Sequence, residues 1–140
     1  MCNDTLSGEE LLYLNLKALY EGFGYARFQM RRFEEYSLYA DNLNFLKSRD
    51  IITFGGRDGR LLALKPDVTL SIVKNCKGAK ERVRKVYYRE SVYRTDRPGG
   101  QFREINQIGL ECVGELDFYA GLEVLYLAAE SLKAVGGGYV

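Results

Sequence analysis

Two polar side chains in the segment Gln101–Val113 are spaced so that they could bind a small ligand together. In an extended strand alternate side chains share a face, so Gln107 and Glu111 would lie on one face with only Gly109 between them. An ideal strand separates them by roughly 13 Å and leaves no side chain in the space between. An amide and a carboxylate around such a space could hold a small ligand. Equally, Gly109 could mark a bulge or a close packing contact, with both polar groups in solvent.

Charged groups in two other segments could contribute to the same chemistry. Arg94 and Arg97 bracket a loop, and a guanidinium can bind a carboxylate or a phosphate through two hydrogen bonds. Asp67 and Thr69 follow Pro66 near an expected helix start. The carboxylate of Asp67 could pair with an ammonium group of a ligand, or it could simply cap the helix. The residue types therefore admit both a binding role and a structural role.

The composition excludes several other kinds of site. The 140 residues contain no His and no Trp, which removes imidazole acid–base chemistry, Ser/His/Asp and Cys/His triads, and His-ligated metals. The cysteines are odd in number and far apart, a pattern of neither a disulfide framework nor a zinc site; they are Cys2, Cys76 and Cys112. We expect Cys76 and Cys112 to be small buried apolar residues, and the protein to reside in a reducing cytoplasm, with no metal and no cofactor.

The net charge of +1 conceals an uneven distribution. Residues 77–103 carry nine positive and three negative groups, and residues 104–140 carry one and six. The basic segment, with Tyr87, Tyr88 and Tyr93, could bind RNA through phosphate contacts and base stacking, or it could be the solvated face of a strand pair. No apolar run is long enough to cross a bilayer, so no membrane association is expected.

The elements that must position these residues follow from periodicity and turn signals. Ser7 and Glu10 have the spacing of a capping box before a helix that ends at Gly22 and Gly24. Up to Leu64, the pattern predicts a strand over Tyr25–Glu34, a short helix within Glu35–Lys47, and a hairpin over Ile51–Leu64 with a turn at Gly55–Gly59. After it, the pattern predicts a helix from Pro66 to Asn75 and a long hairpin of Arg82–Arg94 and Gln101–Glu115. A helix over Tyr119–Val135 and a strand beginning at Tyr139 complete the prediction. This order predicts an α+β fold with a mostly antiparallel sheet and flanking helices.

Three segments in this order resemble motifs of one enzyme class. Phe33–Tyr39 resembles the first class-defining motif of class II aminoacyl-tRNA synthetases, Leu64–Thr69 the amino-acid-binding loop of the histidyl type, and Tyr93–Pro98 with Phe102–Glu111 the second class-defining motif. From about Leu11 to its end, the chain is similar to histidyl-tRNA synthetases and to their paralogue, the regulatory subunit of ATP phosphoribosyltransferase. The resemblance implies that residues 1–140 are the N-terminal part of such a core domain, before the third motif.

The resemblance also implies roles for individual residues. Asp67, Thr69 and Gln107 would hold the α-amino group of a bound histidine, and Glu111 would accept a hydrogen bond from its imidazole. Arg94 would meet the carboxylate or, in a synthetase, the α-phosphate of ATP. The first motif implies a homodimer, because that motif builds the dimer interface.

Departures from the synthetase pattern favour the regulatory paralogue. The family's acid, glycine and loop arginine are replaced by Asp67, Val68 and Gln101, and Asp96 replaces a glutamate that helps hold ATP. The second motif's loop is also shorter, and Arg31 stands where a proline is usual. These changes weaken a nucleotide site and spare the amino-acid pocket. We therefore expect a histidine-binding protein without activity of its own that partners the short-form catalytic subunit. The alternative is a fragment of a histidyl-tRNA synthetase, which would also bind tRNA.

Overall fold

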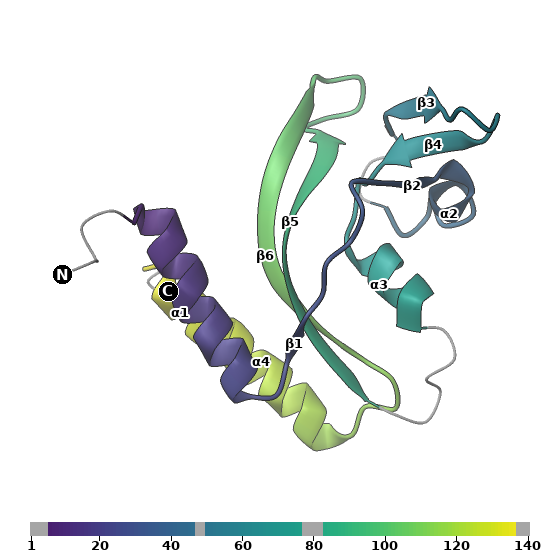
Figure 1. Cartoon of the computed structure of the whole chain (residues 1–140). Coiled ribbons are helices and arrows are strands. Elements are labelled where there is room, and N and C mark those ends of the chain that lie inside the picture. Colours follow the sequence, from purple (N-terminus) through teal and green to yellow (C-terminus); the bar gives the residue numbers. More distant parts are fainter. Residues whose placement is uncertain (1–5, 47–49, 77–82, 137–140) are drawn as a thin grey trace. The chain divides into compact units, whose positions relative to one another are not determined.

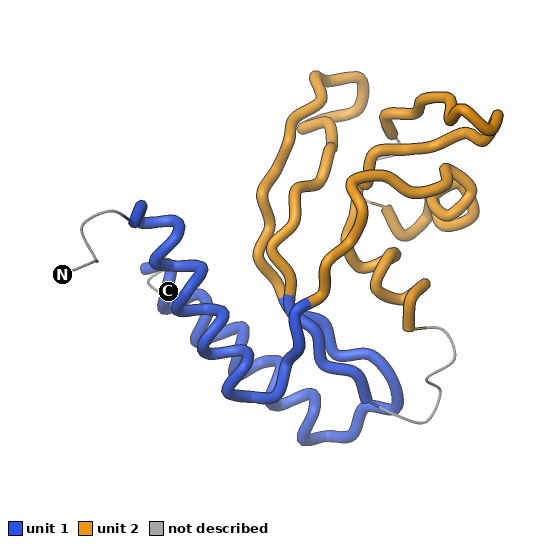
Figure 2. The backbone as a smooth tube through the Cα atoms, viewed as in Figure 1, with its two compact units in different colours: residues 1–27, 78–87, 110–140 blue, residues 28–77, 88–109 orange. Residues whose placement is uncertain are grey.

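The computed structural model describes residues 6–46, 50–76 and 83–136. The chain divides into two compact units (Figure 2): unit 1 comprises residues 1–27, 78–87 and 110–140, and unit 2 comprises residues 28–77 and 88–109. Strands β5 (Arg84–Thr95) and β6 (Phe102–Val113), labelled in Figure 1, each contribute residues to both units. The two units are therefore described one at a time.

Unit 1 contains the two long helices. Helix α1 (Gly8–Gly22) begins with the predicted capping box, in which the Glu10 N–H donates to Ser7 Oγ at 3.3 Å and the Ser7 N–H donates to Glu10 Oε2 at 2.7 Å. Helix α4 (Phe118–Ala134) is capped by Asp117 and followed by Gly136 at a φ of 81°. The hydroxyls of Tyr20 and Ser131 lie 2.7 Å apart and join the two helices. Both helices are confirmed close to their predicted bounds.

The first sheet has the order β1-β5-β6. Strand β1 (Ala26–Arg27) pairs in parallel with β5 at Val86 and Tyr87. Tyr87 is fully buried and donates its hydroxyl to Glu21 at 2.7 Å. The hairpin of β5 and β6 is confirmed, and side-chain hydrogen bonds from Tyr93 to Glu104 and from Ser91 to Asn106 show that the two strands run antiparallel.

The second sheet, entirely in unit 2, has the order β2-β4-β3 and is antiparallel. Strands β3 (Thr53–Gly55) and β4 (Leu61–Leu64) form the predicted short hairpin, and Gly59 in its turn has a φ of 80° that favours glycine. Helix α2 (Tyr36–Ala40) packs on this sheet, with Tyr39, Ala63 and Leu70 in the core.

The prediction of one strand over Tyr25–Glu34 is wrong. The segment supplies β1 to the first sheet and β2 (Phe33–Glu35) to the second. Between these strands the Met30 N–H donates to the Glu90 side chain, and the Arg32 carbonyl accepts from the Lys65 N–H. These partners replace a continuous strand ladder, and alternation in the sequence cannot distinguish the two arrangements.

Helix α3 (Thr69–Cys76) begins three residues later than the prediction from Pro66. The reason is that Asp67 Oδ1 accepts a hydrogen bond from the Leu70 N–H at 3.0 Å and so caps the first turn. The burial expected for the cysteines is also wrong, because Cys76 and Cys112 are free and only half-buried. Cys2 and the expected strand at Tyr139 lie outside the described residues.

The described helices include none that is both long enough and apolar enough to cross a bilayer. Within residues 6–46, 50–76 and 83–136, no three His, Cys, Asp or Glu residues gather as metal ligands would.

Candidate functional site

The long hairpin presents two faces, as the alternation of β6 predicts. Tyr93 Oη donates to Glu104 Oε1 at 3.3 Å, and Ser91 Oγ donates to Asn106 Oδ1 at 2.7 Å. These contacts place Glu104 and Asn106 on one face of the strand, as predicted. Gln107, offset by one residue from Asn106, belongs to the opposite face.

The expected empty space over Gly109 is filled by Tyr88 from the neighbouring strand. A Cβ atom built on Gly109 would lie 2.6 Å from Tyr88 Oη and 2.7 Å from Tyr88 Cζ. The prediction of an unfilled patch is therefore wrong, and the alternative, a close packing contact, is correct. The sequence could not show this, because the alternation of one strand carries no information about which side chain of its partner lies opposite.

The five predicted ligand residues fall in different surroundings. Thr69 opens α3, Arg94 lies near the end of β5, Gln107 lies in β6, and these three belong to unit 2 together with Asp67. All five are half-buried. Glu111 belongs to unit 1, where it lines an apolar groove of about 560 Å³ between β6 and α4.

A backbone hydrogen bond joins two of the predicted site segments within unit 2. The Tyr93 N–H donates to the Lys65 carbonyl at 3.0 Å. Arg94 follows Tyr93 directly, and Asp67 and Thr69 lie two and four residues after Lys65. The structure therefore brings the backbone of the segment 65–69 beside the end of β5 that carries Arg94.

Arg94 has an unsatisfied group that a ligand could use. Its Nε atom is buried and has no hydrogen-bond partner among the described residues. A buried N–H of a charged guanidinium without an acceptor is costly, and such groups in native proteins are normally paired. An anionic oxygen placed there would satisfy it, which suits the carboxylate or phosphate role that the resemblance assigns to Arg94.

The loop between β5 and β6 is held by Asp50. Its Oδ2 atom accepts from Thr95 Oγ1 at 3.0 Å and from the Gly99 N–H at 3.1 Å. Within the loop, Asp96 Oδ2 lies 3.6 Å from a guanidinium nitrogen of Arg103. Arg97 is exposed. Asp96, which stands in place of the family's ATP-binding glutamate, is therefore paired with a residue of the same hairpin.

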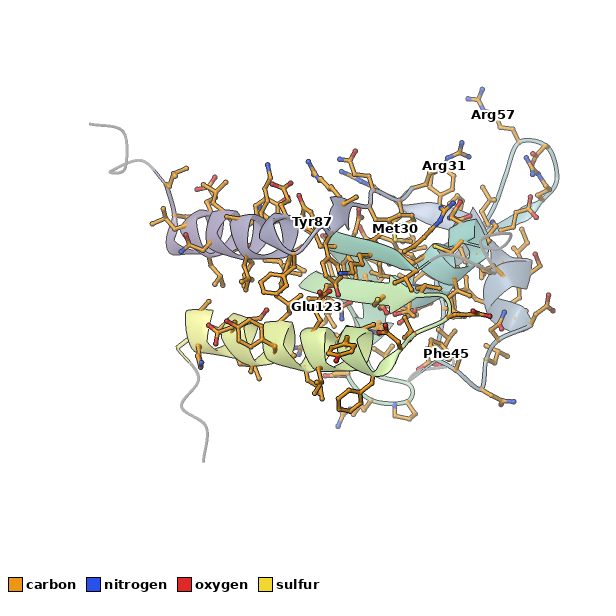
Figure 3. All side chains as sticks on the ribbon, turned by 90° about the horizontal axis from the view of Figure 1, so that it is seen from below. Met30, Arg31, Phe45, Arg57, Tyr87 and Glu123 are labelled. Carbon is orange, nitrogen blue, oxygen red and sulfur yellow. The ribbon has the colours of Figure 1, made fainter. Side chains whose placement is uncertain are left out.

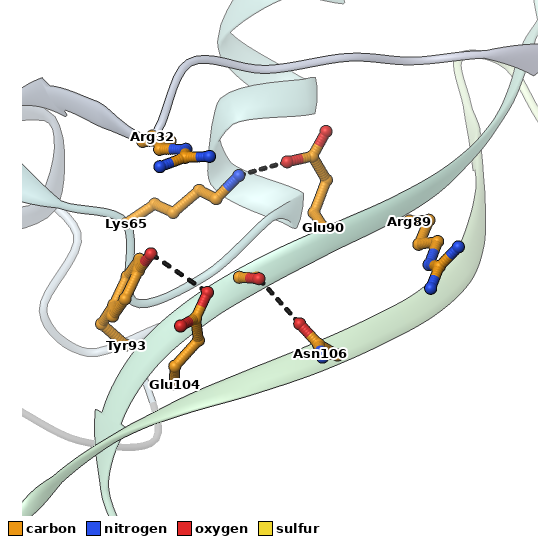
Figure 4. Close-up of a pocket in the computed structure, with 8 residues that line it drawn as sticks. Arg32, Lys65, Arg89, Glu90, Tyr93, Glu104 and Asn106 are labelled. Atoms are coloured by element: carbon orange, nitrogen blue, oxygen red, sulfur yellow. Dashed lines mark hydrogen bonds and ion pairs between the residues drawn. The ribbon is translucent and has the colours of Figure 1, made fainter. Parts of the chain in front are cut away.

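A polar cavity of about 250 Å³ lies beside these segments in unit 2 (Figure 4). Its wall carries an ion pair between Lys65 and Glu90, whose side chains are only 2% and 13% exposed. None of the four predicted ligand residues of unit 2 lines it; the lining residues are Arg32, Lys65, Arg89, Glu90, Ser91, Tyr93, Glu104 and Asn106. Sequence reasoning missed Glu90, because it lies outside the three motifs.

The tyrosines expected to stack on RNA bases are engaged within the fold. Tyr87 is fully buried, and Figure 3 shows it among the side chains of unit 1. The Tyr93 hydroxyl is bound to Glu104, and burial, followed by the nearby Glu104 charge, raises the pKa of Tyr93. These contacts do not support the RNA-binding hypothesis. Arg57, by contrast, points away from unit 2 at the tip of the short hairpin (Figure 3).

Comparison with known proteins finds similarity to histidyl-tRNA synthetases and to a regulatory subunit of ATP phosphoribosyltransferase. The family described as "Histidyl-tRNA synthetase" matches residues 5–139. A histidine–tRNA ligase of Solibacter usitatus is 30% identical over 128 residues, which cover 86% of this chain and 31% of that protein. An ATP phosphoribosyltransferase regulatory subunit of Thermoanaerobacter pseudethanolicus is 35% identical over 120 residues, which cover 81% of this chain and 30% of that protein.

The fold is also found among solved structures. A chain of the ATP phosphoribosyl transferase complex of Thermotoga maritima matches with a TM-score of 0.67 at 24% identity, over 93% of this chain and 43% of that one. The present chain spans about a third of the length of the two curated relatives. Its α+β architecture, with antiparallel sheets and flanking helices, is that of the class II aminoacyl-tRNA synthetase core. The chain belongs to the histidyl-tRNA synthetase family.

Proposed function

We propose that this protein binds histidine and acts as a regulatory subunit of ATP phosphoribosyltransferase, in the first step of histidine biosynthesis. The observation that carries histidine binding is Arg94, whose buried Nε lacks an acceptor beside the segment that contains Asp67 and Thr69. The histidine carboxylate would meet Arg94, and its ammonium group would meet Asp67, Thr69 and Gln107. On the family resemblance alone, we assign Glu111 to the imidazole.

The regulatory role rests on the residues that differ from a synthetase. Gln101 replaces a loop arginine and is exposed, and Asp96 is engaged by Arg103. Asp50 fixes the loop through Thr95 and Gly99. This loop lacks one arginine, its Asp96 is paired with Arg103, and its ends are fixed by Asp50. Such a loop is poorly suited to bind the phosphates of ATP. The relative from Thermoanaerobacter pseudethanolicus, a regulatory subunit by name, supports this role.

The partner that we propose is a short-form ATP phosphoribosyltransferase catalytic subunit. The solved complex from Thermotoga maritima contains a chain of this fold, which supports the choice of partner. Because coupling between sites is reciprocal, histidine should bind more tightly to the state of the assembly that it favours. Cys76 and Cys112 carry free thiols, and we place the protein in the cytoplasm.

We also propose a homodimer through the outer face of the second sheet. Phe33 and Phe54 are 43% and 38% exposed on neighbouring parts of this sheet, and their ring centroids lie 5.5 Å apart. Phe33 belongs to the segment that resembles the dimer motif. Light scattering of the wild type and of Phe33→Asp tests this; a dimer that persists unchanged in the variant would refute the choice of surface.

Calorimetry with histidine tests the binding proposal. Glu111→Gln removes the charge from one hydrogen bond and should cost about 1.5–3 kcal/mol, a loss of about 10- to 150-fold in affinity. Glu115→Gln, an exposed glutamate four residues along, is the matched control and should bind as the wild type does. Wild-type protein that neither binds histidine nor makes the short catalytic subunit sensitive to it would overturn the proposal.

The second candidate function is that of a histidyl-tRNA synthetase core. It is favoured by Arg97 and Pro98, which keep the synthetase pattern, and by the ligase from Solibacter usitatus. Histidine-dependent exchange of pyrophosphate into ATP decides between the two. Pyrophosphate exchange by this protein would establish that it is a synthetase. Histidine binding without pyrophosphate exchange would support the regulatory function.

A further inference from the structure

The carboxylate of Glu90 joins three segments that are distant in the sequence. It projects from the middle of β5, where Oε1 accepts a hydrogen bond from the Met30 N–H at 3.2 Å and Oε2 pairs with Lys65 Nζ (Figure 4). Met30 lies in the extended segment that leads to β2, and Lys65 opens the segment that contains Asp67 and Thr69. One side chain of β5 therefore connects the segment that precedes β2 with the segment that contains Asp67 and Thr69.

The burial of this ion pair indicates that it fixes the position of two segments relative to each other. Lys65 is 1% exposed as a whole residue, and the side chain of Glu90 is 13% exposed. Taking two charges out of water costs several kcal/mol per ion, and a pair of well-packed apolar residues is often as stable. A contribution to stability therefore does not by itself explain why this position holds an ion pair. A role in fixing the distance between β5 and the segment 65–69 does explain it.

The surroundings of Lys65 show what the pair holds in place. The Lys65 N–H donates to the Arg32 carbonyl at 3.2 Å, and the Lys65 carbonyl accepts from the Tyr93 N–H. Both residues of the pair line the cavity of about 250 Å³. The described contacts of Lys65 therefore tie its backbone to Arg32 and Tyr93 and its side chain to Glu90.

We propose that Glu90 and Lys65 are positioning residues that hold Asp67 and Thr69 in register with Arg94 for binding of an amino acid. This inference rests on the proposed histidine site. Neither residue touches the ligand: each acts through the backbone of the segment 65–69 and its bond to Tyr93. Loss of the pair should leave the fold intact and weaken ligand binding, because the binding groups would no longer be preorganised.

The test compares histidine affinity, thermal stability and amide exchange in the double variant Lys65→Met/Glu90→Met, which keeps long side chains and removes both charges. We expect at least tenfold weaker histidine binding, a midpoint of unfolding close to that of the wild type, and at least tenfold faster exchange of the Met30 and Tyr93 amides. The charge-swapped variant Lys65→Glu/Glu90→Lys should recover part of the affinity, which a loss of packing alone would not allow.

Two further variants keep the test decisive. Lys74→Met breaks the Lys74–Glu34 ion pair of 3.0 Å in the same unit and should bind histidine as the wild type does. Glu90→Gln, which keeps an acceptor for Met30, replaces the double variant if that variant folds poorly. Unchanged affinity and unchanged Tyr93 exchange without the pair would overturn the inference. Wild-type protein that does not bind histidine would overturn the proposed function instead, and the Tyr93 exchange would still test the geometry.

Discussion

The contact between Gly109 and Tyr88 makes a quantitative prediction for Gly109→Ala. The new methyl group would lie 2.6 Å from Tyr88 Oη, whereas non-bonded heavy atoms prefer separations of about 3.5–4.0 Å. The Tyr88 ring must therefore move by about 1 Å. Forcing a methyl group into a filled site costs about 1–3 kcal/mol, or roughly 3–12 °C in the midpoint of unfolding for a chain of this length.

A helical glycine supplies the matched control. Gly121 in α4 has no atom within 4 Å of its Cβ position, so Gly121→Ala should stabilise the protein by about 0.5–1 kcal/mol. Thermal and urea unfolding measure both variants. Removal of the ring should abolish the clash, so adding Gly109→Ala to Tyr88→Ala should cost nothing. If Gly109→Ala is as stable as the wild type, or if its cost is the same without the ring, the reasoning is refuted.

Three other changes test separate parts of the fold. Asp67→Asn keeps a side-chain acceptor for the Leu70 N–H, so stability should hold within about 0.5 kcal/mol while histidine affinity falls about fivefold, as measured by calorimetry. Leu127→Ala, at a fully buried position of α4, should cost about 2–5 kcal/mol in urea unfolding; a smaller loss would show that the helix packs loosely. Burial raises the pKa of Tyr39 to about 12, so stability should fall from pH 10 to pH 12, where the unfolded state releases this proton first; Tyr39→Phe should make that fall shallower, and an unchanged slope would contradict the assignment.

The local elements could be predicted because their signals lie within a few residues of each other. Ser7 and Glu10 satisfy each other's backbone groups across one helical turn, and Gly59 supplies the positive φ of the short hairpin. The long hairpin likewise follows from two β-rich segments around a loop. Such features depend on backbone geometry over short distances, and residue types report them directly.

The distribution of strands between sheets could not be predicted, because it depends on partners far away in the chain. The sequence pattern of Tyr25–Glu34 predicts one strand, yet the Met30 N–H in the middle of this segment donates to the carboxylate of Glu90, 60 residues later. The same limit applies to the candidate site. Nothing in the sequence around Glu90 shows that it meets Lys65, and nothing around Gly109 shows that Tyr88 covers it. Side-chain periodicity assigns a face, and tertiary contacts decide what fills it.

Asp67 shows how a structural role and a binding role can coincide in one side chain. The sequence presented them as alternatives, a helix cap or a counter-ion to an ammonium group. The structure shows the cap, in which Oδ1 accepts from the Leu70 N–H. A carboxylate has about four acceptor positions, so one hydrogen bond leaves capacity for a ligand. The cap also fixes the side-chain rotamer, which lowers the entropy lost when a ligand binds. The cap is therefore an argument for the binding role of Asp67, since a carboxylate already ordered by α3 is a better partner for an ammonium group than a freely rotating one.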